Sequence, residues 1–420
     1  MKYSRPRGTQ DILPPDIHVW RYVEGVFDAT FERYGYEPVR TPIFESTDVF
    51  LRSVGEATDI VSKEMYTFND RGGRSITLRP ENTAAVIRAF LENGFHRRGG
   101  ITRWCYTGPM FRYDRPQAGR YRQFHQVGSE VIGSLSPLLD VETIDVVTTA
   151  LEALGFTDLV VKLNSVGCAE CRKSYTDILR SALAKLQDRL CEDCDERALK
   201  NPMRVFDCKR CEDVKAELPS ISDHLCQGCA AHFDQVKSNL DAIGRTYEID
   251  ARLVRGLDYY TRTTFEILHG ELGAQNALCG GGRYDDLVEQ CGGPSTPAVG
   301  FSAGLERIIS VLPDQGSSLA SRGSDVDFYV ICLDDASAPR ALRAARVLRA
   351  FGRAELDASM RALKKQLRNA ERRGARVSLL VGGDDPDRVI WKDMEKREQI
   401  EIEDDGLLAF AERFCEGDNG

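Results

Sequence analysis

Hydrophobic and polar residues alternate with two different periods along the first 163 residues. In residues 16–35, DIHVWRYVEGVFDATFERYG, apolar side chains recur every three or four positions, which predicts an amphipathic helix. Residues 74–80, RSITLRP, and 103–113, RWCYTGPMFRY, are typical of strands. Because such runs lie close together or are separated by glycine turns, we expect an antiparallel or mixed sheet, not a doubly wound parallel one.

The pattern changes three times further along the chain. Residues 164–244 are mostly helical and hold eight of the thirteen cysteines, and residues 245–312 return to strands before a final helix. Residues 313–325, PDQGSSLASRGSD, have the composition of a linker. In residues 326–420, two strand-like runs enclose an arginine-rich helical pattern, which predicts a small βαβ-type domain.

Length and composition describe an ordinary globular protein. A chain of 420 residues with 42% hydrophobic and 29% charged residues has enough material for two or three domains and is not disordered. The N-terminal segment lacks the apolar core of a signal peptide, and no apolar run approaches the roughly 20 residues of a membrane span. We therefore expect a cytoplasmic protein. Thirteen cysteines without a secretory signal argue against a disulfide framework.

The chain carries a formal charge of −9, yet four arginines gather around a Pro-Gln-Ala-Gly turn. They are Arg112, Arg115, Arg120 and Arg122. Alternation along the second strand of this hairpin places Gln126 and Glu130 on one face, which Arg112 joins if the strands pair in register. Guanidinium groups bind phosphate bidentately, so this face suits a nucleotide or an acyl phosphate. The alternative is a solvated, charged hairpin.

Residues 108–126, GPMFRYDRPQAGRYRQFHQ, resemble motif 2 of the class II aminoacyl-tRNA synthetases, and in detail the histidyl-tRNA synthetase family. Similar segments follow the family's order along nearly the whole chain. They are RGTQDILPPD (7–16), VRTPIFE (39–45, motif 1), TLRPENTAAVIRAF (77–90), LVRGLDYYTRTTFEI (253–267), GGGRYDDLVEQCGG (280–293) and PAVGFSAGLERII (297–309, motif 3).

The resemblance implies an α+β fold with a class II antiparallel six-stranded sheet flanked by helices. Residues 1–163 and 245–312 would form this catalytic core, residues 164–244 a mostly helical insertion over the tRNA acceptor stem, and residues 326–420 an α/β anticodon-binding domain after the linker. The implied activity is that of a histidine–tRNA ligase. ATP, with Mg²⁺, activates L-histidine to histidyl-adenylate, and the histidyl group passes to the 3′ end of tRNA(His). A homodimer is implied as well.

Neither step needs a covalent enzyme nucleophile, so the protein must align anions and neutralise developing charge. By resemblance, Arg112, Arg255 and Arg307 carry out this catalytic role. The implied histidine site consists of Glu81, Asn82, Thr83, Arg112, Gln126, Glu130, Arg255, Tyr259, Tyr260 and Tyr284. Glu130 and Tyr260 would each contact one nitrogen of the imidazole ring. The glycine run at 280–282 is expected to form a tight turn near the ring, and Arg115, Gln117 and Arg120 to contact the tRNA.

The insertion contains four Cys-x-x-Cys pairs. They are Cys168/Cys171, Cys191/Cys194, Cys208/Cys211 and Cys226/Cys229. The spacing between pairs is close to that of Cys₄ zinc sites, and it fits two structural zinc ions or one zinc ion with two reduced pairs. Relatives in the family generally work without zinc here, and free cysteine is also an acceptable core residue. A redox role is less expected, because no thioredoxin-like pattern surrounds the pairs.

The C-terminal helical pattern is strongly basic. Residues 339–376 contain twelve Lys or Arg residues against three Asp or Glu residues. Such a surface suits the phosphates of RNA, although a charged run is often only a solvated helix face.

Two other functions remain possible at this point. One is a histidine-binding regulatory paralogue of ATP phosphoribosyltransferase, which would lack the catalytic arginines and the C-terminal domain. The other is a zinc-dependent nucleic-acid-binding protein, which would leave the histidine-specific segments unexplained.

Overall fold

The computed structural model describes residues 3–54, 61, 64–114, 120–208, 210–270, 277–313, 326–359, 361–383 and 385–417. It divides into two compact units, Met1–Ser317 and Ser318–Gly420. Among the described residues, none of the helices combines the length and the apolar character that a membrane span requires.

The first unit is built on a large sheet, whose strand order is β1-β5-β6-β11-β10-β9-β7-β8. The six inner strands pair antiparallel with their neighbours. They are β5 (Thr102–Phe111), β6 (Gln123–Ile132), β7 (Leu159–Ser165), β9 (Thr261–His269), β10 (Ala277–Arg283) and β11 (Ala298–Gly304). The expected six-stranded antiparallel sheet is therefore confirmed. Two-residue strands, β1 (Glu37–Pro38) and β8 (Glu248–Ile249), extend it in parallel at its edges.

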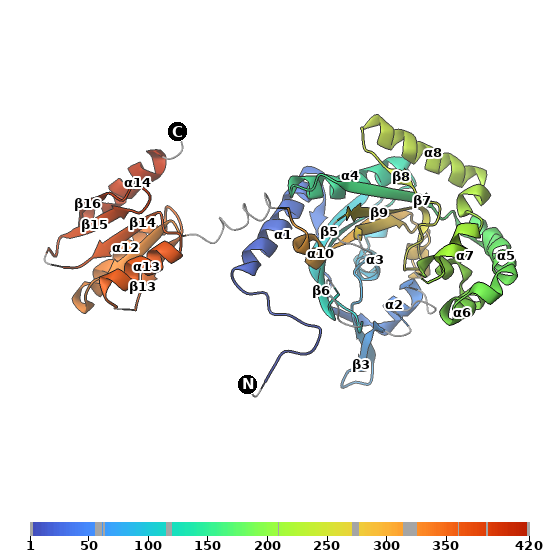
Figure 1. Cartoon of the computed structure of the whole chain (residues 1–420), viewed down its shortest axis with the longest axis horizontal. Helices are drawn as coiled ribbons and strands as arrows, with labels where there is room; N and C mark the ends of the chain where they lie inside the picture. Colours follow the sequence, from blue (N-terminus) through green and yellow to red (C-terminus); the bar gives the residue numbers. More distant parts are fainter. Residues whose placement is uncertain are drawn as a thin grey trace. The chain divides into compact units, whose positions relative to one another are not determined.

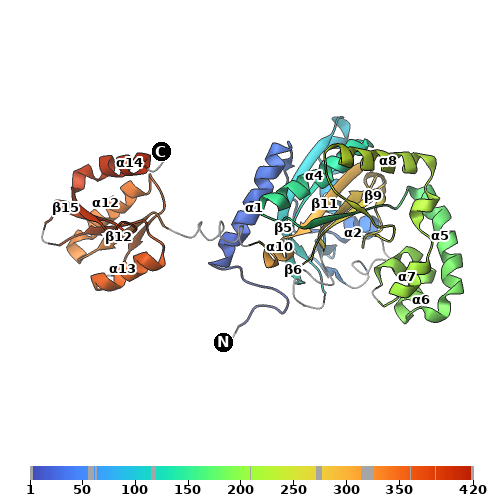
Figure 2. The same ribbon diagram turned by 45° about the horizontal axis from the view of Figure 1, so that its top comes forward.

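Alternation along these strands separates the two faces of the sheet. One face packs on α1 (Asp16–Arg33), α4 (Pro137–Ala153), α8 (Gln227–Ala242) and α10 (Leu305–Ser310), and α1 and α4 are seen along it in Figures 1 and 2. Its core includes Phe27, Val147 and Phe265, each fully buried. The helical spacing of Trp20, Val23 and Phe27 gives α1 its buried stripe.

The opposite face of the sheet carries the candidate site. It packs against α3 (Thr83–Glu92), α9 (Leu287–Gln290) and part of the insertion. A smaller antiparallel sheet stands beside α2 (Thr47–Val54) and consists of β2 (Phe44–Ser46), β4 (Ser75–Leu78) and β3 (Tyr66–Asn69). The insertion is mostly helical, with α5 (Ala169–Lys185), α6 (Glu192–Lys200), α7 (Glu212–Glu217) and α8, and Figure 1 shows these helices grouped on the side of the unit away from α1.

The second unit has a five-stranded sheet in the order β13-β12-β14-β15-β16. The parallel part, β12 (Phe328–Cys332), β13 (Ala354–Asp357) and β14 (Val377–Val381), corresponds to the expected βαβ pattern. An antiparallel hairpin of β15 (Arg388–Asp393) and β16 (Gln399–Glu403) extends it, which the sequence pattern did not indicate. Helices α12 (Ala338–Leu348) and α14 (Leu407–Gly417) pack on one face and α13 (Leu363–Arg372) on the other.

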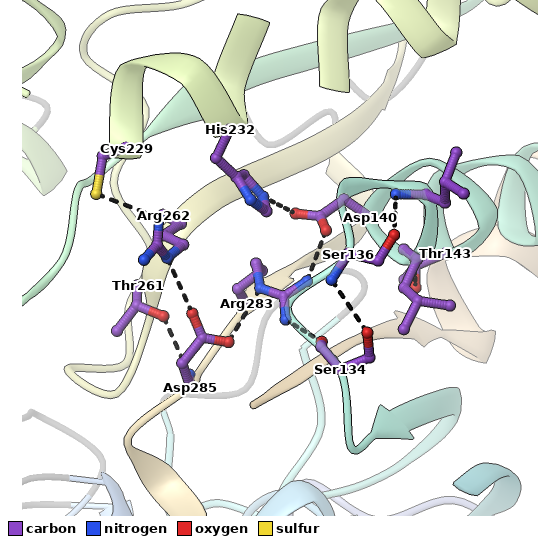
Figure 3. Close-up of polar contacts among 12 residues, drawn as sticks. Ser134, Ser136, Asp140, Thr143, Cys229, His232, Thr261, Arg262, Arg283 and Asp285 are labelled. Atoms are coloured by element: carbon purple, nitrogen blue, oxygen red, sulfur yellow. Dashed lines mark hydrogen bonds and ion pairs between the residues drawn. The ribbon is translucent and has the colours of Figure 1, made fainter. Parts of the chain in front are cut away.

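A buried ion-pair network ties the insertion to the large sheet (Figure 3). Arg283 of β10 is fully buried, and its Nη1 lies 2.6 Å from Oδ2 of Asp140 on α4. Its Nε pairs with Oδ1 of Asp285 at 3.0 Å, and its Nη2 donates to the carbonyl oxygen of Ser134. The second oxygen of Asp140 lies 3.1 Å from Nε2 of His232 on α8. The carboxylate of Asp140 therefore connects three elements, namely β10, α4 and the insertion helix α8.

We expect Asp140→Ala to lower the free energy of unfolding of the first unit by about 3–5 kcal/mol, because it leaves the buried guanidinium of Arg283 without its shortest ion pair. The urea unfolding midpoint measures this effect. The exposed Asp158, changed to Ala, is the matched control and should change stability by less than about 0.5 kcal/mol. A loss below about 1 kcal/mol in Asp140→Ala would show that the pair does not hold these elements together.

Candidate active site

A cavity of about 410 Å³ opens on the sheet face opposite α1 and α4. Its walls come from β5, β6, β9, β10 and β11, from the N-terminal end of α3 and from the segment before β9. The structure brings together at this cavity most of the residues that the sequence singled out: Glu81, Asn82, Thr83, Arg112, Arg120, Gln126, Arg255, Tyr259, Tyr260 and Arg307. A volume of this size is typical of a site for a small-molecule substrate.

Arg112 and Arg307 are held at the cavity by backbone carbonyl groups. Arg112 directly follows β5, and its Nε donates to the carbonyl oxygen of Pro80 at 2.8 Å. Arg307, in the first turn of α10, donates from Nη1 to the carbonyl oxygen of Ala277 at 2.9 Å. Burial lowers the pKa of Arg307, and the neighbouring positive charges of Arg120, Arg112 and Arg255 lower it further. The cavity therefore brings several guanidinium groups together, and such groups bind anionic ligands.

The third arginine, Arg255, lies on the segment before β9. Its Nη1 forms an ion pair with Oε1 of Glu266 on β9. Burial acts most strongly against its charged form, but Glu266, Tyr260 and Cys279 together outweigh burial and raise the pKa of Arg255. A Cβ atom at Gly280 would overlap this guanidinium group, so the strand position beside it requires glycine.

Glu130 and Tyr284 lie beneath the floor of the cavity, each only 1% exposed. Three hydroxyl groups donate to the carboxyl group of Glu130: Thr83 Oγ1 at 2.7 Å, Tyr106 at 3.2 Å, and Tyr284. Burial raises the pKa of Glu130 to about 8. In this structure the carboxyl group is thus surrounded by hydroxyl donors on both of its oxygens.

The N-terminal end of α3 forms another wall. Glu81 accepts hydrogen bonds from the backbone N–H groups of Thr83 at 2.6 Å and Ala84 at 3.0 Å, and burial raises its pKa. The amide oxygen of Asn82 accepts from Thr41 Oγ1 at 2.6 Å and from Arg79 Nη1 at 3.2 Å. This oxygen of Asn82 therefore anchors the segment around Thr41, a contact that the sequence did not indicate.

Two aromatic rings line the same wall as Arg255. Tyr259 and Tyr260 are almost fully buried and pack against each other, with ring centroids 4.8 Å apart. Tyr259 also packs edge-to-face on Tyr284 at 5.5 Å. These contacts give a small pocket with aromatic walls next to Glu130, and its size suits a planar ring.

Two buried polar atoms at the cavity have no hydrogen-bond partner in the described part of the chain. They are Oε1 of Gln126, whose Nε2 donates to Ser302 at 3.4 Å, and Nε of Arg255. Because buried polar groups in folded proteins are nearly always hydrogen-bonded, their position at the cavity is consistent with partners that a polar substrate supplies.

Of the expected tRNA contacts, Arg115 and Gln117 lie outside the described residues. Arg120 lies at the cavity and forms an ion pair with Asp114 at 3.0 Å.

The glycine run is not a turn. Gly280 to Gly282 lie inside β10, where Gly281 faces the ring of Phe265 and Gly282 has a φ of 152°. The expectation of a tight turn is wrong, because these glycines serve close approach within the sheet. Tyr106 and Glu266 also line the cavity and were not expected from the sequence, although both lie in strands where alternation indicates the cavity face.

The eight cysteines of the insertion form two groups of four. Cys168 and Cys171 meet Cys226 and Cys229, whereas Cys191 and Cys194 meet Cys208 and Cys211. Within each group all Sγ atoms lie within 4.8 Å of one another. Two of these separations are 3.6 Å (Cys168–Cys171) and 3.7 Å (Cys191–Cys208), close to the roughly 3.8 Å edge of a tetrahedron with Zn–S bonds of about 2.3 Å.

Each cysteine group also has features that stabilise thiolates, the form of cysteine that binds zinc. One cysteine of every pair precedes a helix as its N-cap: Cys168 before α5, Cys191 before α6, Cys211 before α7 and Cys226 before α8. Backbone N–H groups donate to sulfur, as from Cys226 to Cys171 at 3.1 Å. A helix N-terminus and such donors stabilise negative charge on sulfur. The donor set fits Zn²⁺.

Known proteins agree with this geometry. Residues 8–308 match the family model described as "Histidyl-tRNA synthetase", and residues 327–413 match "Anticodon binding domain". The histidine–tRNA ligase of Halothermothrix orenii is 48% identical over 96% of this chain and 97% of its own length. That of Natranaerobius thermophilus is 48% identical over 99% of both chains.

A solved structure gives the same result. The apo histidyl-tRNA synthetase of S. aureus superposes with a TM-score of 0.82 at 37% identity and covers 97% of this chain and 99% of its own. The family match spans the whole first unit that carries the cavity. The chain belongs to the histidyl-tRNA synthetase family.

Proposed function

We propose that the cavity is the site at which this histidine–tRNA ligase forms histidyl-adenylate and transfers the histidyl group to tRNA. The observation that carries the proposal is the convergence of Arg112, Arg255 and Arg307 on one cavity, beside the carboxyl group of Glu130 and the phenol of Tyr260. In the first step the carboxylate of histidine attacks the α-phosphorus of ATP, an O–P bond forms, and pyrophosphate leaves.

The three arginines have distinct tasks in this step. Arg112 contacts the α-phosphate and the carboxylate of histidine, Arg307 contacts the γ-phosphate, and Arg255 stabilises the charge that develops as the two anions meet. Mg²⁺ bound with ATP supplies further charge neutralisation on the phosphates. Guanidinium groups remain charged at any physiological pH, so this stabilisation does not depend on a proton.

Histidine is recognised at the aromatic end of the cavity. Glu130 and Tyr260 contact the two ring nitrogens, Glu81 and Thr83 the α-amino group, and Gln126 the carboxylate through its amide Nε2. Tyr259 and Tyr284 form the walls, and Asn82 holds the loop shape through its contacts with Thr41 and Arg79. A wrong amino acid would leave these buried polar groups unpaired, which gives discrimination without editing.

In the second step the terminal ribose hydroxyl of tRNA attacks the carbonyl carbon of the adenylate, an ester forms and AMP leaves. We assign residues 1–163 and 245–312 to this catalytic core and residues 164–244 to an insertion over the acceptor stem. Arg120, together with Arg115 and Gln117, contacts the acceptor end. In the anticodon-binding domain, exposed basic side chains of α13, such as Lys364, Arg368 and Arg372, offer contacts to RNA phosphates.

We further propose a homodimer that acts in the cytoplasm, where translation takes place. Two consecutive large apolar side chains, Ile43 and Phe44, are exposed on the motif 1 segment. Adjacent exposed apolar side chains on this segment fit a surface that a partner covers.

The regulatory paralogue is disfavoured. The catalytic arginines are present at the cavity, and residues 327–413 match the anticodon-binding domain that such a paralogue would lack. Curated relatives that match over 96–99% of this chain are histidine–tRNA ligases.

We also propose that the two cysteine groups are structural zinc sites. One Zn²⁺ would be held by Cys168, Cys171, Cys226 and Cys229, and the other by Cys191, Cys194, Cys208 and Cys211. Zinc held by four thiolates has no open position for a substrate, so these ions would shape the insertion and take no part in the chemistry.

Arg255→Ala tests the catalytic assignment. We expect it to lower the rate of histidine-dependent ATP–pyrophosphate exchange by about 100- to 1,000-fold, because it removes a preorganised charge worth roughly 3–4 kcal/mol in the transition state. Histidine affinity, measured by calorimetry, should change far less. The exposed Arg252, changed to Ala, is the control and should retain full exchange. Equal losses in exchange and in histidine affinity would contradict the assignment.

The pH dependence of histidine binding tests Glu130. Burial raises its pKa to about 8, so the free pocket holds a proton at neutral pH, while the imidazole of free histidine, with a pKa of about 6.5, is neutral. The bound pair shares this one proton. Below about pH 6.5 binding must release a proton, and above about pH 8 it must take one up. We therefore expect the affinity of the wild type to decrease on both sides of this window.

Glu130→Gln is the matched variant, because it keeps the shape of the side chain and cannot titrate. Its histidine affinity should fall by roughly tenfold or more, which corresponds to about 1.4 kcal/mol, and the alkaline decrease that begins near pH 8 should disappear. Calorimetry in two buffers of different ionisation enthalpy counts the protons. A wild-type affinity that keeps rising above pH 8 would rule out the shared proton.

Zinc content can be measured directly by emission spectroscopy of the purified protein. We expect two zinc ions per chain, one fewer in Cys191→Ser and one fewer in Cys226→Ser, since each change removes a ligand of a different group. Cys415→Ser, which lies outside both groups, should retain both ions. Substoichiometric zinc in the wild type would refute the two sites.

A further inference from the structure

Residues 255–262 carry Arg255, Tyr259 and Tyr260 and are held from the insertion side by three separate contacts. The first comes from Arg172 on α5, the residue directly after Cys171. Its Nη1 donates to two backbone carbonyl oxygens, those of Asp258 and Tyr260, both at 3.0 Å. These two bonds fix the backbone on either side of Tyr259, so the position of α5 determines where the two tyrosines lie.

The second contact comes from a segment that lies, in the chain, between two cysteines of the other group. The 3-10 turn Pro202–Asp207 connects Cys194 to Cys208 in the chain. Arg204 of this turn donates from Nη2 to the carbonyl oxygen of Gly256 at 2.7 Å and lies 3.0 Å from Oδ1 of Asp258. Nδ2 of Asn201 donates to the same oxygen of Asp258 at 3.1 Å.

The third contact lies at the start of β9 and is drawn in Figure 3. Arg262 has a φ of 48°, which is unusual for a residue with a side chain. Its backbone is fixed on both sides, by N–H donation to Gly167 O at 2.8 Å and by Val166 N–H donation to its own carbonyl at 2.7 Å. Its Nη1 lies 3.6 Å from Sγ of Cys229, and its Nε lies 3.3 Å from Asp285. The side chain thus connects a cysteine of the first group to the buried network of Arg283.

Buried apolar side chains such as Tyr175, Leu179 and Phe206 pack the insertion against the core, but two helices of the insertion are short. These helices, α6 and α7, are only 9 and 6 residues long and strongly acidic in their first turns. Isolated helices of this length are unstable in water, and metal binding supplies folding free energy to small segments of this kind. Without the ions, Arg172 and Arg204 would lose the fixed frame from which they hold residues 255–262.

We propose that the two cysteine groups, once loaded with zinc, act as a clasp that positions residues 255–262, so that recognition of histidine depends on the metal content of the insertion. Arg172 and Arg204 are positioning residues in this proposal, because they act through the backbone and side chains of residues 255–262, although Arg204 also lines the cavity. The proposal rests on the histidine site and the zinc sites proposed above. It assigns the cysteine groups a role in histidine recognition beyond shaping the insertion.

Arg172→Ala separates positioning from metal binding, because Arg172 is not a zinc ligand. We expect this variant to retain two zinc ions and to raise the KM for histidine in pyrophosphate exchange at least tenfold, while the KM for ATP changes less than twofold. Arg180→Ala, on the same helix with its side chain half exposed, is the control and should behave as the wild type. Asp258→Ala, which removes the side-chain acceptor of Arg204 and Asn201, should likewise raise the KM for histidine and leave the KM for ATP nearly unchanged.

Chelation of the wild type gives a readout that does not require catalysis. Removal of zinc should weaken histidine binding in calorimetry at least tenfold and speed amide hydrogen exchange in residues 255–262. Readdition of zinc alone should reverse both effects. Such a reversal would show that the weaker binding was not caused by irreversible unfolding of the sample.

The possible failures are distinguishable. If the wild type contains no zinc, the zinc-dependent clasp is wrong, even if pyrophosphate exchange shows that the ligase assignment is correct. A zinc-loaded Arg172→Ala and a zinc-loaded Asp258→Ala that both keep the wild-type KM for histidine would overturn the positioning role alone. An absence of pyrophosphate exchange in the zinc-loaded wild type would instead refute the proposed function. In that case the effect of zinc removal on histidine binding in calorimetry and on hydrogen exchange in residues 255–262 would still test the clasp.

Discussion

Three guanidinium groups share one desolvated cavity, and their mutual repulsion is the constraint around which the first unit is organised. Arg112 and Arg307 donate to carbonyl groups of Pro80 and Ala277, and Arg255 pairs with Glu266. The carbonyl groups hold Arg112 and Arg307 in fixed positions at the cavity wall, from which their guanidinium groups can face an anionic substrate. A site preorganised in this way stabilises developing negative charge without reorganisation at the moment of reaction.

The sheet makes room for these groups by omitting side chains. A Cβ atom at Gly280 would overlap Arg255, one at Gly300 would overlap the carboxyl group of Glu130, and one at Gly128 would lie 2.6 Å from the hydroxyl of Tyr106. The three glycines lie on the inner strands β10, β11 and β6. The stiffness of paired strands and the space left by glycine together allow large polar side chains to be buried against backbone.

Contacts from the insertion also hold part of the cavity wall in place. The segment with Arg255, Tyr259 and Tyr260 is fixed by Arg172, which directly follows Cys171 in the chain, and by Arg204, which lies between Cys194 and Cys208. The network of Asp140, His232 and Arg283 ties α8 to the core at a second point. The wall of the cavity is thus built by two parts of the chain, the inner strands of the sheet and a segment that the insertion holds.

The sequence by itself determined much of this protein. Strand alternation placed Gln126, Glu130 and Arg112 on one face, and the antiparallel pairing of Met110 with Phe124 in the structure puts them there. Motif resemblance identified the family and the six-stranded antiparallel sheet, because these motifs lie within single strands or turns and are local features of the chain.

Only the tertiary structure decided which distant groups meet. The four Cys-x-x-Cys pairs combine as first with fourth and second with third, and a hydrogen bond from the N–H of Cys226 to Sγ of Cys171 joins the start of α8 to α5. Asn82 contacts Thr41 and Arg79, Glu130 lies beneath three hydroxyl groups, and the glycine run lies inside a strand. Each of these depends on contacts between residues far apart in the chain, and spacing along the sequence carries no information about such contacts until the elements are packed.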